Sequence, residues 1–163
     1  MKEIIDKLSS YNLFNYLLPG IIFAVIAKDF LPFHFIQEDV IIGAFVYYFI
    51  GLVISRFGSS VIEPVLKRFR FLKFSDYSDF VSASKNDPKL EMLSEANNVY
   101  RTFCSVFILL LLLKLYNVIE FKFSIIKSYN SYILIISLLI MFLFAYRKQT
   151  KYITKRIEKN KKI

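Results

Sequence analysis

The chain has 163 residues, of which 56% are hydrophobic and 18% aromatic, and its formal net charge is +9. This composition is too apolar for an ordinary soluble domain of this length, and the length corresponds to one domain. A single cysteine and a single histidine exclude an intrachain disulfide framework and offer no Cys/His zinc site.

Four stretches are nearly free of charge and dense in Leu, Ile, Phe and Val. A helix needs about 20 mainly apolar residues to cross hydrocarbon, because each residue adds about 1.5 Å of rise. We therefore predict an all-α membrane protein with a single membrane domain over residues 1–163. We place its transmembrane helices at residues 8–27, 39–57, 100–119 and 128–146.

Basic residues are unevenly distributed along the chain. They gather in the segment 58–99 with its flanking arginines and in the tail 147–163, whereas the turns after the first and third predicted helices hold few. Because Lys and Arg near helix ends stay in the cytoplasm, we expect both termini and segment 58–99 to be cytoplasmic. The predicted location is the bacterial inner membrane, crossed in several passes.

The basic tail, residues 147–163, directly follows the last predicted span. Each basic residue near anionic headgroups contributes about 1 kcal/mol to membrane binding. The tail lacks the aromatic interleaving and the fold of a nucleic-acid module. We therefore expect its partner to be an anionic lipid surface and not nucleic acid, and we expect segment 58–99 to be the surface for any cytoplasmic partner protein.

The first predicted helix carries polar residues within its apolar stretch. Asn12, Asn15 and Pro19 are spaced three and four residues apart and so share one helix face. Amides are costly in hydrocarbon unless paired, which predicts that this face contacts other helices or water. Pro19 lacks an N–H and frees the carbonyl of Asn15, so we expect a kink that is either a packing feature or a hinge.

The second predicted helix has small residues on one face. Gly43, Tyr47, Gly51, Ser55 and Ser59 recur every fourth residue. Within this row Gly51, Ser55 and Ser59 form a series of small residues, which lets another helix approach closely. The approaching helix can belong to the same chain or to a second subunit. A homo-oligomer is therefore one of our expectations.

Residues 61–80 mix basic side chains with Phe and Leu, as in segments that lie in the membrane interface. The alternation at 68–73 fits a short strand equally well. Asp87 followed by Pro88 is a good helix start. The third helix is then about 30 residues long, near 45 Å at about 1.5 Å per residue, and extends into the cytoplasm.

Polar residues converge where the second and third helices leave the membrane. Arg56 and Arg101 end these helices at similar depth, and Glu63, Asn97 and Asn98 lie within a few turns of them. Each arginine can simply extend its guanidinium to water. Alternatively, Arg56 or Arg101 pairs with Glu63 and ties the interfacial segment to the third helix, and this boundary is where we place any function.

Motifs of enzymatic chemistry are absent from the sequence: it has no phosphate-binding Gly-rich loop, no zinc-protease motif and no nucleophile elbow. The acidic residues of the cytoplasmic segment stand among as many basic ones. We predict no catalytic residues, no metal and no cofactor, and therefore no enzyme. An ion-coupled transporter is also not expected, because no acid or arginine lies mid-membrane.

Residues 12–20, 51–59 and 97–101 resemble small bacterial inner-membrane proteins with four helices, some of which occur in anti-phage defence loci. The resemblance implies a membrane subunit that works in a defence or stress setting, often as an oligomer, and supplies no catalytic residues. Our hypothesis is an oligomeric inner-membrane subunit that senses or perturbs the membrane. The alternative is a small passive channel or a transport accessory subunit.

Overall fold

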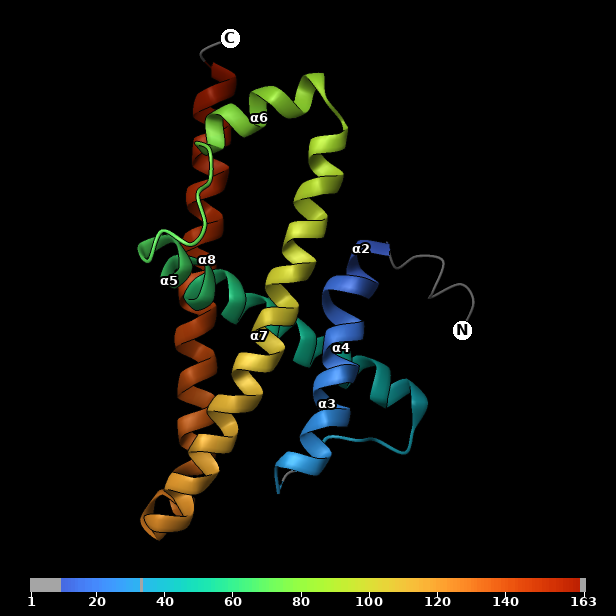
Figure 1. Ribbon diagram of the computed structural model, residues 1–163, viewed down its shortest axis with the longest axis vertical. Coiled ribbons are helices and arrows are strands. Elements are labelled where there is room, and N and C mark those ends of the chain that lie inside the picture. Colours follow the sequence, from blue (N-terminus) through green and yellow to red (C-terminus); the bar gives the residue numbers. More distant parts are fainter. Residues whose placement is uncertain (1–9, 33, 162–163) are drawn as a thin grey trace.

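The computed structural model describes residues 10–32 and 34–161, which form helices joined by turns, with no strand among them (Figure 1). Within these residues, four helices are long and apolar enough to cross a membrane: Ser10–Asp29, Val40–Arg68, Lys89–Lys122 and Ile125–Lys159. The prediction of an all-α, multi-pass membrane protein is confirmed at this level. Residues 8–9 of the first predicted span and 162–163 of the tail lie outside the described residues.

The first helix consists of α2 (Ser10–Asn12), the π-turn η1 (Leu13–Leu17) and α3 (Leu18–Phe30). In η1 the Leu18 N–H donates to the carbonyl of Leu13, five residues earlier. Pro19 follows directly and has no N–H to donate, which explains why the regular i to i−4 register is interrupted here. The disturbance expected at Pro19 is therefore a widened turn inside a helix that continues.

The second helix repeats this arrangement. It consists of α4 (Val40–Phe57), the π-turn η2 (Gly58–Ile62) and α5 (Glu63–Arg68). Asp39 begins it by accepting hydrogen bonds from the N–H groups of the second and third residues of α4. The Glu63 N–H donates to the carbonyl of Gly58, one residue before Pro64. The helix expected at 39–57 thus continues through a second proline-associated π-turn to Arg68.

After α5 the chain reverses. Arg70 has a positive φ of 59°, and the Phe71 N–H donates back to the carbonyl of Leu66, which closes the turn. Of the alternating residues 68–73, the first ends α5 and the others form this turn and the coil after it, so the alternative of a short strand is wrong. The positive φ is a strained conformation for a residue with a β-carbon.

Two long helices complete the chain. After α6 (Tyr77–Asn86), Asp87 accepts a hydrogen bond from the Lys89 N–H at 3.0 Å and starts α7 (Lys89–Lys122). The turn η3 (Ser124–Tyr129) leads into α8 (Asn130–Lys161). Across this turn, the Tyr116 hydroxyl donates to Oδ1 of Asn130, and Nδ2 of Asn130 donates to Oε1 of Glu120. These bonds join the end of α7 to the start of α8. This α8 includes most of the tail that we expected at 147–163.

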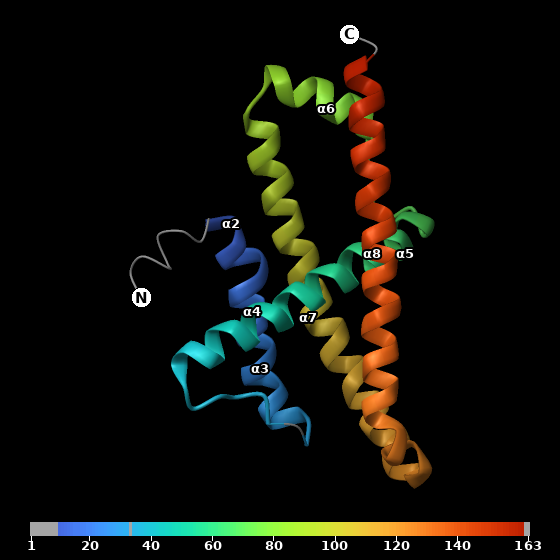
Figure 2. The ribbon, with the colours of Figure 1, turned by 180° about the vertical axis from the view of Figure 1, so that it is seen from behind.

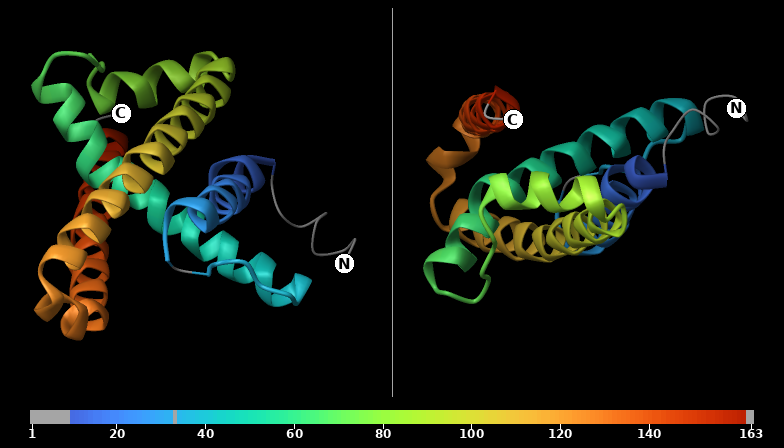
Figure 3. Two further views of the ribbon diagram at one scale, coloured as in Figure 1. Left: turned by 60° about the horizontal axis from the view of Figure 1, so that its bottom comes forward. Right: turned by 90° about the horizontal axis from the view of Figure 1, so that it is seen from above.

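The helices form a small core to which α8 is attached at one side. Helix α4 crosses α3, α7 and α8 obliquely and contacts all three (Figures 1 and 2). The buried core is made by α3, the residue after it, α4 and α7: Phe23, Ala27, Leu31, Ile54, Val106 and Leu110. Helix α8 lies at the edge of the molecule, away from α3 (Figure 3), and none of the residues in its apolar half is buried.

Glycines set the close contact between the first and second helices. A β-carbon at Gly20 would overlap the carbonyl oxygen of Tyr47, and one at Gly51 would overlap the carbonyl oxygen of Tyr16. The two helix backbones therefore touch, as small residues permit in membranes. Of the two partners that we considered for the small face of α4, the structure places a helix of the same chain against Gly51.

Candidate functional site

Glu63 is the one charged side chain among the buried residues of the described part of the chain, with 7% of its surface exposed. It begins α5, at the point where η2 ends and directly before Pro64. A carboxylate removed from water needs charged or hydrogen-bonding partners. The residues around Glu63 therefore show which helices its carboxylate joins.

Three cations from three helices surround Glu63. Arg101 of α7 places Nη1 2.9 Å from Oε2, while Lys67 of α5 and Lys148 of α8 place Nζ 2.9 Å and 3.4 Å from Oε1. The exposed fraction of the side chain is 18% for Arg101, 27% for Lys148 and 41% for Lys67. We call these four residues together with Ser59 the Glu63 cluster, and its net charge is positive.

Lys148 has a second role, which follows from Pro64. In the i to i−5 register of η2, the N–H that would reach the Ser59 carbonyl is the one that Pro64 lacks. Lys148 Nζ donates to this carbonyl at 2.7 Å and also contacts Ser59 Oγ at 2.8 Å. With Glu63, these acceptors match the three protons of the ammonium group. One lysine of α8 thus satisfies both the carboxylate and the carbonyl released by the proline.

Aromatic rings extend the Glu63 cluster. Lys148 Nζ lies 5.8 Å from the ring centroid of Tyr152, and the rings of Tyr152 and Tyr77 are 4.9 Å apart. Lys67 Nζ lies 4.0 Å from the ring centroid of Phe74. Cations are attracted to aromatic faces at these distances. The cluster therefore connects α5, α7 and α8 to the start of α6 and to the coil before it.

A second polar group lies between the first three membrane helices. Asn15, Ser55 and Thr102 are buried, with 0%, 4% and 0% of their surfaces exposed. Asn15 Nδ2 donates to Ser55 Oγ at 3.3 Å, and Thr102 Oγ1 donates to Asn15 Oδ1 at 2.8 Å. We call these three residues the Asn15 cluster. The amide is paired with other helices, as expected for a polar group in hydrocarbon.

The two clusters are neighbours along α7. Asn98 Nδ2 donates to the Tyr11 hydroxyl at 3.3 Å, and the carbonyl of Asn98 lies 2.9 Å from Thr102 Oγ1. Arg101 of the Glu63 cluster stands next to Thr102 in sequence. One turn of α7 therefore contacts the first helix on one side and α5 on another.

Most of the predicted site residues are buried or contact another helix, and a few are not. Of the two arginines considered as partners of Glu63, Arg101 makes the pair, while Arg56 makes no ion pair with the described residues. Asn97 is exposed, and Asn12 is half-buried. The remaining predicted residues are buried or contact another helix: Asn15, Pro19, Gly51, Ser55, Glu63, Asn98 and Arg101.

Sequence reasoning missed Ser59, Thr102 and Lys148 as site residues. Pro64 signals that a carbonyl one turn earlier needs an unusual donor, but it does not name the donor. Lys148 is one of many basic residues after the last span, and nothing local separates it from the others. The described residues contain no group of His, Cys, Asp and Glu that could hold a metal ion.

No protein-family model matches the chain, and no curated protein or solved structure does so either.

Proposed function

We propose that the chain is a non-enzymatic interaction subunit of the bacterial inner membrane, which senses or perturbs the membrane through the Glu63 cluster. The observation that supports this proposal is one buried carboxylate joined to cations of α5, α7 and α8. Such a cluster couples the cytoplasmic segment to the spans. A displacement of α5 must either carry α7 and α8 with it or break a partly buried ion pair.

The proposed orientation puts both termini and residues 58–99 in the cytoplasm. Helix α5 and the turn after it then lie in the inner interface, and the first turns of α7 project beyond the membrane. Phe69 and Phe71 support this placement, because they are 78% and 76% exposed beside basic residues, and exposed aromatic rings among cations suit the headgroup region.

Helix α8 is the element whose position we expect to change. Its apolar half has no buried residue, and its hydrogen bonds to η2 are those of Lys148 with Ser59. Segments with few buried contacts open at the lowest cost in free energy. Release of Lys148 would therefore free α8 from η2 and α5 while the core of α3, α4 and α7 stays packed.

Oligomer formation remains part of the proposal, with a different surface from the one first considered. The small face of α4 is occupied within the chain at Gly51 and Ser55, whereas α8 presents exposed apolar residues such as Leu134, Ile135 and Leu139. A second copy can pack there in place of lipid. The defence or stress setting rests on the sequence resemblance.

The alternative of a passive channel has less support. A pore requires polar groups along its whole length. The buried polar side chains of the described residues gather instead around the C-terminal end of α4, where η1, the start of α5 and one part of α7 meet it: Asn15, Ser55, Glu63, Thr102 and Ser105. This distribution favours coupling between helices at one level.

The proposal is tested by measuring the distance between α7 and α8 in different lipids. Spin labels are attached to cysteines at Met92 and Ile157, which are exposed, in a Cys104→Ser background, and pulsed EPR is recorded in nanodiscs. We expect the distance distribution to change between zwitterionic and anionic lipid. Lys148→Met should give the released distribution in both lipids, whereas the control Lys159→Met on the same helix should behave like wild type. A distribution that depends on neither lipid nor Lys148 contradicts the proposal.

A further inference from the structure

Helix α8 presents a stripe of exposed residues along almost its whole length. The stripe repeats every seven residues, in steps that alternate between four and three. Its apolar side chains are between 51% (Ile157) and 75% (Tyr146) exposed, and its one threonine is exposed as well. In chain order its members are Tyr132, Ile136, Leu139, Leu143, Tyr146, Thr150, Ile153 and Ile157.

The contacts of α8 with its own chain lie on the other side of the helix. Lys148 reaches Glu63, and the ring of Tyr152 packs on that of Tyr77. At about 100° per residue, Lys148 and Tyr152 point about 150° or more away from the middle of the stripe. Helix α8 also lies at the edge of the molecule (Figure 3), which leaves the stripe open to a partner.

The polar half of α8 shows that the stripe is more than the apolar surface of a membrane span. From Arg147 to Lys161 the sequence has three apolar or aromatic residues: Tyr152, Ile153 and Ile157. Tyr152 packs within the chain, and the two isoleucines both continue the stripe. In a membrane span every face is apolar, so a repeat there selects no face, but among charged residues it selects one.

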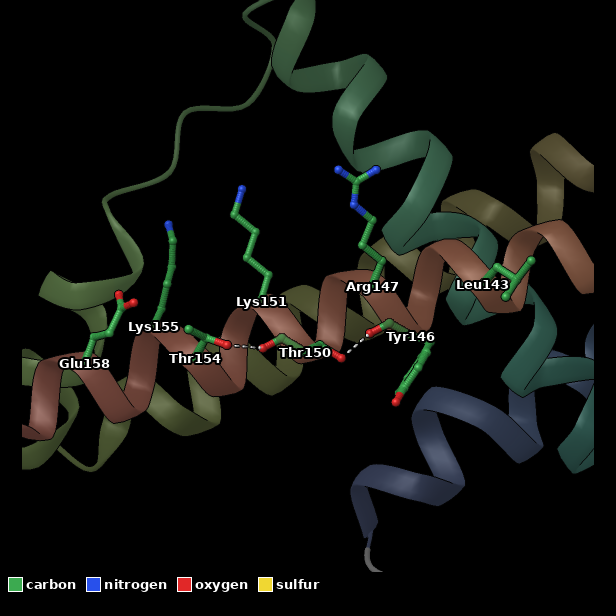
Figure 4. A pocket seen from close by; sticks show the side chains of 8 residues that line it. All are labelled: Leu143, Tyr146, Arg147, Thr150, Lys151, Thr154, Lys155 and Glu158. Atoms are coloured by element: carbon green, nitrogen blue, oxygen red, sulfur yellow. Dashed lines mark hydrogen bonds between the residues drawn. The ribbon is translucent and has the colours of Figure 1, made fainter.

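The cations of this half point away from the stripe. Tyr146 extends to one side of α8, whereas the basic residues drawn beside it extend to the other: Arg147, Lys151 and Lys155 (Figure 4). A contact along the stripe therefore does not require these cations to be buried, and they stay available to anionic headgroups.

Lipid does not cover the end of the stripe in the proposed orientation. Helix α8 is continuous from Asn130 to Lys161 and is held to η2 at Lys148. Ile153 and Ile157 follow Lys148 at about 7 Å and 13 Å along the helix axis. The headgroup layer on one side of a bilayer is only about 5–8 Å thick. Ile157 therefore faces water unless a protein covers it.

A second copy of α8 fits this stripe. Apolar residues at positions a and d of a seven-residue repeat are the pattern of a coiled coil, and copies in one membrane share an orientation, so their helices run parallel. The a positions hold three β-branched residues, which favour two strands: Ile136, Thr150 and Ile157. The Thr150 hydroxyl donates to the carbonyl of Tyr146 in its own helix at 3.0 Å and needs no other partner.

The area of the stripe is sufficient for a dimer. Its seven apolar side chains each expose roughly 100 Å², which amounts to about 700 Å² per chain. A standard protein interface buries about 800 Å² per partner, and the residues that flank the stripe supply the remainder.

We propose that α8 forms a parallel two-stranded coiled coil with α8 of a second copy of this chain, which begins in the membrane and continues into the cytoplasm through Ile153 and Ile157. The proposal rests on the proposed function for the orientation and for the existence of an oligomer, and it adds the contact surface and the number of copies. Lys148 points away from this surface, so the Glu63 cluster and the dimer are compatible.

Cysteine cross-linking tests which face of α8 meets the second copy. Single cysteines are placed in the full chain, in a Cys104→Ser background, and oxidised with copper phenanthroline in bacterial inner-membrane vesicles. Disulfide-linked dimers of Thr150→Cys, Ile153→Cys and Ile157→Cys should form at least tenfold faster than those of the controls Lys151→Cys and Lys155→Cys. Equal rates at all five positions, or a maximum at either control, overturn the proposal.

A second measurement tests the strength of the dimer. Energy transfer between copies labelled at Met92→Cys is followed in phosphatidylcholine liposomes as the protein is diluted in lipid. Ile153→Glu and Ile157→Glu combined should weaken association at least 30-fold, because each places a carboxylate in the apolar stripe. The control Lys155→Gln and Lys159→Gln also lowers the net charge from +9 to +7 and should associate within about threefold of the parent.

The outcomes separate this proposal from its alternatives. Equal weakening in both combined variants would make the effect one of net charge, and no energy transfer in the parent at any dilution would show a monomer. Either result overturns the coiled coil, as does unchanged association of the glutamate variant with a native circular dichroism spectrum. Both measurements are made between chains in a single lipid. They do not depend on a change in the distance between α7 and α8, so failure here is distinguishable from failure of the proposed function.

Discussion

Replacing Glu63 by Gln is expected to lower the free energy of unfolding by about 3–5 kcal/mol, because two partly buried cations lose their counter-charge. At 2.9 Å and 3.4 Å, the attractions of Arg101 and Lys148 to Glu63 are each about 5–6 kcal/mol at an effective dielectric constant of about 20. Desolvation of the charges offsets most of this in the folded protein. In the variant the attraction is lost while the desolvation cost of the two cations remains, and the two cations also repel each other.

The double-mutant cycle with Arg101 isolates the pair. Arg101→Ala alone should cost about 2 kcal/mol, less than Glu63→Gln, because Lys67 and Lys148 still neutralise the carboxylate. The double variant should be no less stable than Glu63→Gln alone, which gives a coupling energy of about 2 kcal/mol. Arg101→Lys should restore only part of the loss, because lysine lacks the planar guanidinium.

The measurement is unfolding in mixed micelles by titration with SDS, followed by circular dichroism. Lys67→Ala is the matched control, because it also removes a cation 2.9 Å from Glu63, but one whose side chain is 41% exposed. It should cost no more than about 0.5 kcal/mol. The reasoning is refuted if Lys67→Ala costs as much as Arg101→Ala, or if the effects of Glu63→Gln and Arg101→Ala simply add.

Three further expectations concern orientation and packing. A cysteine at His34 should react with an impermeant thiol reagent added to intact cells, and one at Asn86 should not, both in a Cys104→Ser background; labelling at Asn86 would reverse the proposed orientation. Gly51→Ala should destabilise the protein by about 2–3 kcal/mol in the same SDS titration, because its β-carbon meets the backbone of Tyr16. Gly43 is the control position, because the nearest atom to a β-carbon there is a ring atom of Tyr47 at 3.2 Å. Gly43→Ala should therefore change the free energy of unfolding by less than about 0.5 kcal/mol. Equal losses in Gly43→Ala and Gly51→Ala would contradict the close contact between Gly51 and Tyr16. Thr102→Val should cost about 1 kcal/mol, because Asn15 loses a buried hydrogen bond, and Thr150→Val, at an exposed position, should cost less.

Much of the architecture follows from the sequence alone, because it depends on local properties of the chain. The length of each apolar stretch is enough to predict a span, and Asp87 marks the start of α7 through its own side chain. The pairing of Asn15 and of Glu63 could also be anticipated, since an amide or a carboxylate away from water requires a partner wherever the chain runs. Each of these inferences needs only one residue and its near neighbours.

The identity of those partners was decided by the tertiary structure. Lys148 is 85 residues from Glu63, and local sequence does not distinguish it from the other cations of the tail; it was selected because α8 passes η2 where Pro64 leaves a carbonyl without a donor. The sequence of the small face of α4 does not show whether its partner is a helix of the same chain or of another. In the structure the backbone of Tyr16, from the first helix of the same chain, lies against Gly51. Helix crossings depend on how all side chains of several helices fit together, so no single segment contains the information that places them.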